Sequence, residues 1–264
     1  MPRFALVVIS TILILSPVAA RASDDTIWQD DKSTHFIVYY EESSSFAGEV
    51  ISASENHYQD MIRYFGSLPQ SNFWTWENRC KIYIYASRSN YMERTNQPEW
   101  SSGFADVKRR AIVSYEDAPD FIDSVLPHEM AHLIFREFIE VGNRQVPRWL
   151  DEGFAIAQEE RIRVSLDQAV KKAIKSNSTI ALRDLGQIGS LHVRPAEQAK
   201  LFYAQAQSLT RFLIEKRDSS YFINFCRLLR DGERLEDALR KSYGQDFPTL
   251  EAFEKSWKKY VLNS

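Results

Sequence analysis

The sequence has little glycine, with 9 glycines among 264 residues, about half of the usual roughly 7%. It contains neither the G-x-G-x-x-G of dinucleotide-binding folds nor a P-loop, which argues against nucleotide binding by those routes. An excess of positive charge is also lacking, since 33 basic and 36 acidic residues give a net charge of −3. A protein that neutralises a run of phosphates needs concentrated positive charge, so we expect no nucleic-acid partner. The 44% hydrophobic and 26% charged residues are typical of a globular protein and exclude disorder, coiled coil and collagen.

Long hydrophobic runs are absent except at the N-terminus. Residues 4–15 are mostly apolar, follow the positive Arg3 and precede the small-x-small pattern A-R-A at 20–22. This order is typical of a signal peptide, and the run falls short of the roughly 20 residues that span a bilayer. We therefore expect residues 1–22 to be a cleaved signal peptide and the exported chain, periplasmic or secreted, to begin at Ser23 without a membrane span. The alternative is an uncleaved membrane anchor.

Cysteine is scarce, and the two cysteines, Cys80 and Cys226, lie far apart in the chain. An exported protein meets an oxidising environment that permits a disulfide, but nothing in the sequence places these two residues close together. Two buried free thiols are therefore an equal alternative. No neighbouring residues suggest an activated, catalytic cysteine.

The N-terminal half alternates between strand and helix patterns. We expect a central strand at 35–40, a helix at 46–65 ending at Gly66, a strand at 81–85 and a short helix at 91–95. The polar residues 23–31 before them are expected to be frayed. Two short strands at 103–107 and 111–115, around the charged turn 108–110, predict a hairpin.

From about residue 117 the apolar residues recur at helical spacing. We expect helices at 121–141, 147–164, 165–176, 195–216, 219–230, 235–242 and 250–262. No long linker or repeat divides the chain. The sequence predicts one α+β unit over residues 23–264, with a small mixed sheet in the half at 33–116, including an edge hairpin at 103–115, and a helical half at 117–264.

The motif H-E-x-x-H occupies residues 128–132 inside an apolar, helical segment. Residues four apart share a helix face, so His128 and His132 can bind one ion, and zinc is the metal typical of this motif. Glu129 lies beside such an ion, where its carboxylate can act as general base on a water. The alternative is a structural helix with two surface histidines, which the apolar surroundings disfavour.

A second motif follows, W-L-x-E-G at residues 149–153, with 19 residues between His132 and Glu152. Together the two motifs resemble the gluzincin zinc metallopeptidases, and especially the exported peptidase MA-like proteins. The resemblance implies a thermolysin- or aminopeptidase-like zincin fold, a zinc cofactor held in the helical half, and a peptide or protein substrate. It also implies that Glu152 is the third zinc ligand, and Asp151 is the alternative.

Two further roles rest on this resemblance. Glu159 lies seven residues beyond Glu152, on the same face of the helix expected at 147–164, where it would support a zinc-bound histidine from outside the ligand shell. Tyr203 matches the Y-x-Q pattern of peptidase MA-like proteins and would donate a hydrogen bond to the oxyanion. Its alternatives are a core aromatic role for Tyr203 and His192 as the donor.

In gluzincins the strand upstream of the zinc helix pairs with the extended substrate backbone. Gly103, Phe104, Ala105 and Asp106 occupy this place and are the expected substrate-binding residues. Related aminopeptidases have G-x-M-E-N there, whereas this chain has G-F-A-D-V, with the shorter aspartate at the glutamate position. This departure favours an endopeptidase over an aminopeptidase.

The sequence therefore predicts an exported zinc metallopeptidase that hydrolyses peptide bonds through a zinc-activated water. The alternative is a non-catalytic envelope protein that keeps the gluzincin fold and binds zinc or a peptide. An amidase acting on cell-wall peptide would share the same chemistry. The ligands, the general base and an oxyanion donor are all present as candidates, which favours the enzyme.

Overall fold

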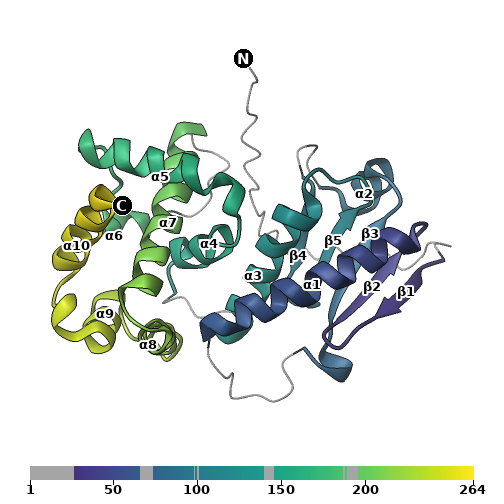
Figure 1. Cartoon of the computed structure of the whole chain (residues 1–264), viewed down its shortest axis with the longest axis horizontal. Helices are drawn as coiled ribbons and strands as arrows, with labels where there is room; N and C mark the ends of the chain where they lie inside the picture. Colours follow the sequence, from purple (N-terminus) through teal and green to yellow (C-terminus); the bar gives the residue numbers. More distant parts are fainter. Residues whose placement is uncertain are drawn as a thin grey trace. The chain divides into compact units, whose positions relative to one another are not determined.

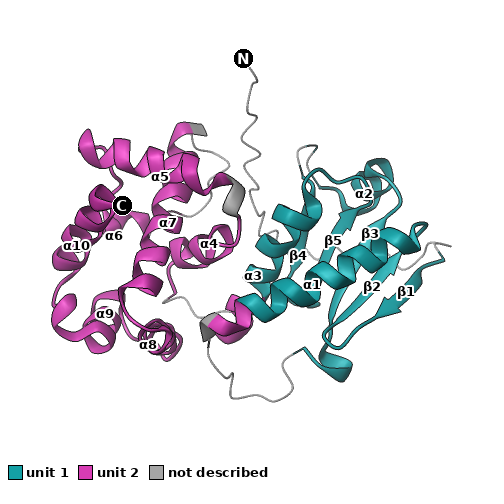
Figure 2. Ribbon diagram, in the orientation of Figure 1, with its two compact units in different colours: residues 1–60, 68–133 teal, residues 61–67, 134–264 magenta. Residues whose placement is uncertain are grey.

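The structure, a computed structural model, describes residues 27–65, 74–97, 99, 101–139, 146–186, 188 and 196–264. The expected signal peptide, Gly66, His192 and the end of the helix expected at 121–141 lie outside these residues. The chain divides into two compact units (Figure 2). We call residues 1–60 and 68–133 the sheet unit, and residues 61–67 and 134–264 the helical unit.

The sheet unit contains one mixed five-stranded sheet (Figure 1). Three neighbouring strands are parallel, and a strand at each edge runs antiparallel to its neighbour. The order across the sheet is β1 (Gln29–Lys32), β2 (Phe36–Tyr40), β3 (Cys80–Tyr85), β5 (Ala111–Tyr115) and β4 (Gly103–Asp106). This architecture confirms the predicted mixed sheet and the hairpin at its edge.

Strand β2 is an inner strand, as predicted, and its side chains alternate between buried and half-buried. Helix α1 (Ser44–Phe65) covers one face of the sheet (Figure 1). The ring of Tyr58 on this helix meets that of Phe36 edge to face. Strand β1 corrects the expectation of frayed residues at 23–31 for positions 29–31, and residues 23–26 lie outside the described residues. It has polar and charged residues because it is an exposed edge strand, which needs only one partner and is protected by charge.

The helix expected at 121–141 is built differently at its start. It begins with the π-helical turn η2 (Phe121–Val125), which leads into α3 (Leu126–Phe138). Pro127 has no N–H and so cannot form the regular bond to the carbonyl four residues back, which is compatible with a wider turn before it. The shorter helices of this unit are η1 (Trp76–Asn78) and α2 (Arg88–Thr95).

In the described part of the helical unit the regular elements are all helices, as predicted. Beyond the last turns of α3 they are α4 (Arg148–Ile156), α5 (Glu160–Lys175), α6 (Leu182–Leu185), α7 (Ala196–Lys216), α8 (Ser219–Arg230), α9 (Leu235–Tyr243), η3 (Gly244–Asp246) and α10 (Leu250–Asn263). The short α6 is a helix that was not predicted from the sequence. No described helix is both long and apolar enough to cross a membrane. Cys80 and Cys226 are both buried free thiols.

The predicted boundary between the helices expected at 147–164 and 165–176 is wrong, because the break between them lies at 157–159. The N–H groups of Gln158 and Glu159 bond to carbonyls three residues back, at 3.1 and 2.9 Å, which tightens and ends α4. Helix α5 then runs through Ser165, whose hydroxyl donates to the carbonyl of Ile162 instead of capping a helix start.

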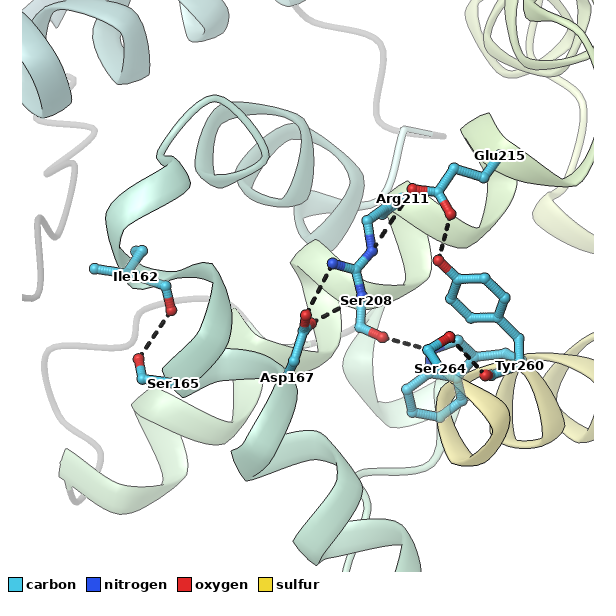
Figure 3. A network of polar contacts seen from close by, with 9 residues as sticks. Ile162, Ser165, Asp167, Ser208, Arg211, Glu215, Tyr260 and Ser264 are labelled. Carbon is cyan, nitrogen blue, oxygen red and sulfur yellow. Dashed lines mark hydrogen bonds and ion pairs between the residues drawn. The ribbon is translucent and has the colours of Figure 1, made fainter.

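A polar network joins three helices of this unit (Figure 3). Arg211 of α7 forms a bidentate ion pair with Asp167 of α5, at 2.8 and 3.0 Å. Tyr260 of α10 donates to Glu215 of α7. Nearby, the indole N–H of Trp257 donates to the hydroxyl of Ser208 at 3.0 Å. These bonds fix α7 between its neighbours, and α7 in turn supports α4.

Helix α4 packs closely on α7 because Gly153 has no side chain. A methyl group there would lie 2.3 Å from both the carbonyl oxygen of Ala206 and the hydroxyl oxygen of Thr210. The backbone of one helix therefore contacts the other directly, one residue after Glu152.

We expect Gly153→Ala to lower the free energy of unfolding by about 3 kcal/mol, because the added methyl group forces α4 and α7 apart. Gly48→Ala is the matched control, since Gly48 is also helical and has open space around its Cα. It should stabilise the protein by about 0.5–1 kcal/mol through helix propensity. Chemical denaturation measures both changes, and equal effects would contradict the packing described.

Candidate metal and catalytic site

The two histidines of the H-E-x-x-H motif converge on α3. Their Nε2 atoms lie 3.1 Å apart and their rings are inclined at 80°. Both side chains are buried, with at most 1% of their surface exposed. Two ligand atoms about 2.0–2.1 Å from a tetrahedral ion lie roughly 3.3 Å apart, so this spacing suits a shared metal ion.

Glu152 completes a group of three. Among the described residues, His128, His132 and Glu152 form the single group of three or more His, Cys, Asp or Glu side chains that could hold a metal ion. Their ligand atoms lie within 4.8 Å of one another, and all three side chains are buried. Two imidazoles and a carboxylate are the donor set of many catalytic zinc sites, so the residues present fit this metal. The structure thus brings together the three predicted ligands, and their role in zinc binding stays a prediction.

The last turns of α3 are attached to α4 within the helical unit. Arg136 binds the carboxylate of Asp151 through Nε at 2.7 Å and Nη2 at 2.5 Å. Both side chains are largely buried, at 12% and 10% exposure. The rings of Phe135 and Phe154 stack with centroids 5.5 Å apart. Asp151, the alternative third ligand, therefore serves to join the two helices and lies outside the metal-binding group.

A second arginine contacts Glu152 directly. Arg148 lies one turn earlier on α4, and its Nε and Nη2 are each 3.2 Å from Oε1 of Glu152. The guanidinium compensates the charge of a carboxylate that is only 1% exposed. The i,i+4 spacing could have predicted this contact, whereas Arg136 and Asp151 are 15 residues apart and their pairing depends on the tertiary fold.

Glu129, the predicted general base, lies in the first turn of α3 and is fully buried. Tyr91 of α2 is also buried. Burial raises the pKa of the Tyr91 phenol, and the negative charge of Glu129 raises it further. The charge of Glu129 therefore influences the Tyr91 phenol.

Tyr203, the predicted oxyanion donor, lies on α7 and is 6% exposed, with its ring next to that of Phe202. It is one turn before Ala206, which packs against Gly153 of α4. Gln205 of the same Y-x-Q pattern has a different function. Its side-chain amide accepts from the N–H of Ile180 at 2.7 Å and donates to its carbonyl at 3.0 Å, which fixes the segment before α6. Tyr203 as donor stays a prediction.

Glu159 does not lie on the same helix face as Glu152, contrary to the prediction. Glu159 lies beyond the end of α4, with φ −98° and ψ 86°, and immediately precedes α5. Its side chain is nonetheless buried, at 5% exposure. Helical spacing therefore gives no support to its predicted role beside a zinc-bound histidine.

The four expected substrate-binding residues form β4, the edge strand of the sheet, and β5 is its one partner among the described strands. At the end of β4, the carboxylate of Asp106 accepts a hydrogen bond from the backbone N–H of Arg109 at 3.1 Å. The side chain of Arg109 is 3.7 Å away. Asp106 thus stabilises the turn of the hairpin, and its charge is partly compensated there.

The family model of the peptidase MA superfamily matches residues 74–263, well over half of the chain. The chain belongs to the peptidase MA superfamily. Peptidases of this superfamily generally depend on zinc, so membership indicates a zinc metallopeptidase. A comparison with curated proteins found no match.

The matched region of this peptidase MA protein contains every residue discussed for the site. It begins just before η1 and so includes strands β3 to β5, helix α3 and the helical unit from α4 onward. The edge strand β1, strand β2 and helix α1 precede it.

The third ligand can be tested by exchanging two neighbouring carboxylates for amides. We expect Glu152→Gln to weaken zinc binding by about 100-fold or more, because it removes an anionic ligand. Asp151→Asn should retain zinc but lower the free energy of unfolding by about 3 kcal/mol, because it breaks the largely buried ion pair with Arg136. Competition with a chromophoric chelator measures the affinity, and thermal unfolding the stability. Stronger zinc loss in Asp151→Asn would make Asp151 the ligand.

Proposed function

We propose that the protein is an exported zinc endopeptidase that hydrolyses peptide bonds with the thermolysin- or aminopeptidase-like arrangement of a gluzincin. The observation that carries this proposal is the buried pair of Nε2 atoms 3.1 Å apart, together with Glu152 and with Glu129 in the same helical turn as His128. Membership of the peptidase MA superfamily supports the same class of reaction.

Each residue of the site would have a different role in the reaction. His128, His132 and Glu152 would hold the zinc ion, which when bound would polarise the scissile carbonyl and lower the pKa of a water molecule. Glu129 would take a proton from the attacking water and pass it to the leaving amine nitrogen. Its burial strengthens this role, because a carboxylate shielded from solvent interacts strongly with nearby charge. Tyr203 would donate a hydrogen bond to the oxyanion, and such a donor contributes roughly 3–4 kcal/mol in other acyl-transfer sites.

The edge strand supports internal cleavage. An extended peptide can add to the outer side of β4 through backbone hydrogen bonds, without a free terminus. An aminopeptidase needs a fixed negative charge for the substrate ammonium, and Asp106 is the acid at that position of the motif. Its contacts with Arg109 reduce its availability for that purpose. Export rests on the sequence of residues 1–22, and the mature chain is proposed to begin at Ser23.

Substitution of the general base separates catalysis from metal binding. Glu129→Gln should keep about one zinc per chain and reduce kcat by 100-fold or more, because general-base catalysis contributes about 10²–10⁴-fold. The metal content and the rate of cleavage of a quenched fluorescent peptide measure the two effects. A fully active Glu129→Gln variant would refute the general-base role. Zinc binding without any cleavage by the unaltered protein would instead indicate a binding protein.

The site of cleavage can be tested with a peptide and its N-acetylated twin. We expect similar kcat/KM values for both, within about threefold, because backbone pairing with β4 does not involve the terminal ammonium. Asp106→Asn should leave this ratio unchanged. Strong preference for the unblocked peptide, lost in Asp106→Asn, would show that the enzyme is an aminopeptidase.

A further inference from the structure

Gly103, the first residue of β4, is distinguished by the space around it. A methyl group at this position would lie 2.9 Å from Cγ1 of Val125 and 3.2 Å from the carbonyl oxygen of Val113. The backbone of Gly103 is not in the left-handed region, in contrast with Gly232 and Gly244. Close packing, and no special backbone conformation, is therefore the reason for glycine here.

Val125, which Gly103 approaches closely, lies directly before α3, the helix that carries Glu129. Val125 ends η2, immediately before α3 begins at Leu126. Glu129 follows Val125 by four residues, and residues at this spacing lie on one face of a helix. The contact between Gly103 and Val125 therefore brings the start of β4 close to the helix face that carries the general base.

A second set of contacts holds the segment 101–103 at the start of β4. The hydroxyl of Tyr91 lies 2.7 Å from Oγ of Ser101, which donates to the carbonyl of Gly103 at 3.3 Å. Tyr91 also experiences the charge of Glu129. On the other side, the hydroxyl of Ser114 donates to the carbonyl of Ser102 at 2.6 Å. The segment 101–103 is thus held from both sides.

We propose that Gly103 is a positioning residue that sets the distance between the substrate-pairing edge of β4 and Glu129. This inference rests on the proposed function, since it assigns a reason for the geometry of that site. A side chain at residue 103 displaces β4 from Val125 and moves a bound peptide with it. A displacement of about 1 Å between reacting groups is enough to lower a rate by about 100-fold.

The proposal is tested by shortening Val125, the side chain that a methyl group at residue 103 would approach. Peptide affinity is measured by fluorescence anisotropy in the zinc-loaded Glu129→Gln protein, where an N-acetylated peptide binds without being cleaved. We expect Gly103→Ala to weaken peptide binding at least tenfold with unchanged zinc content. Adding Val125→Ala to Gly103→Ala should return the affinity to within threefold of that of Val125→Ala alone. In the otherwise unaltered enzyme, kcat/KM should fall and recover in parallel.

Two further variants control for general destabilisation. Gly48→Ala, at a glycine with open space, should change neither affinity nor kcat/KM. Tyr91→Phe, which removes the hydroxyl that binds Ser101, should raise KM at least threefold without loss of zinc, even if Gly103→Ala does not fold. An unimpaired Gly103→Ala, a double variant without recovery or an unaffected Tyr91→Phe would overturn the proposal. Failure of the parent protein to bind any peptide would instead contradict the proposed function.

Discussion

The ion pair between Arg136 and Asp151 joins the last turns of α3 to α4 within the helical unit, and it lies beside two of the predicted zinc ligands in the sequence. Arg136 is four residues after His132, and Asp151 directly precedes Glu152. The pair therefore lies one turn from a ligand on one helix and next to a ligand on the other. Breaking a largely buried ion pair is costly, so this contact resists a change in the register of the two helix segments that it joins.

Burial is the second constraint on the site. His128, His132 and Glu152 are at most 1% exposed, and Glu129 is fully buried. Polar groups removed from water need compensation, which Arg148 supplies in part for Glu152 and a bound cation would supply for the whole group. Helix α7, which carries Tyr203, approaches α4 closely at Gly153, one residue after Glu152.

The sequence predicts most reliably what depends on local spacing. The H-E-x-x-H histidines converge because residues four apart share a helix face, and the hairpin of β4 and β5 follows from two short apolar segments around a charged turn. Glu159 shows where local spacing fails, because α4 ends in a tight turn that contains neither glycine nor proline. Strand β1 is polar, so its own residues show no strand pattern, and it forms by pairing with β2. The spacer role of Gly103 also needs the tertiary structure, since Val125 is far away in the chain.

We predict that His128, His132 and Glu152 hold one zinc ion beside Glu129. Anomalous diffraction at the zinc absorption edge, from crystals of the zinc-loaded protein, would locate this ion. We expect one strong peak about 2.0–2.1 Å from both Nε2 atoms and about 2.0–2.2 Å from a carboxylate oxygen of Glu152. A peak coordinated by Asp151, or no zinc at the histidine pair, would contradict this prediction.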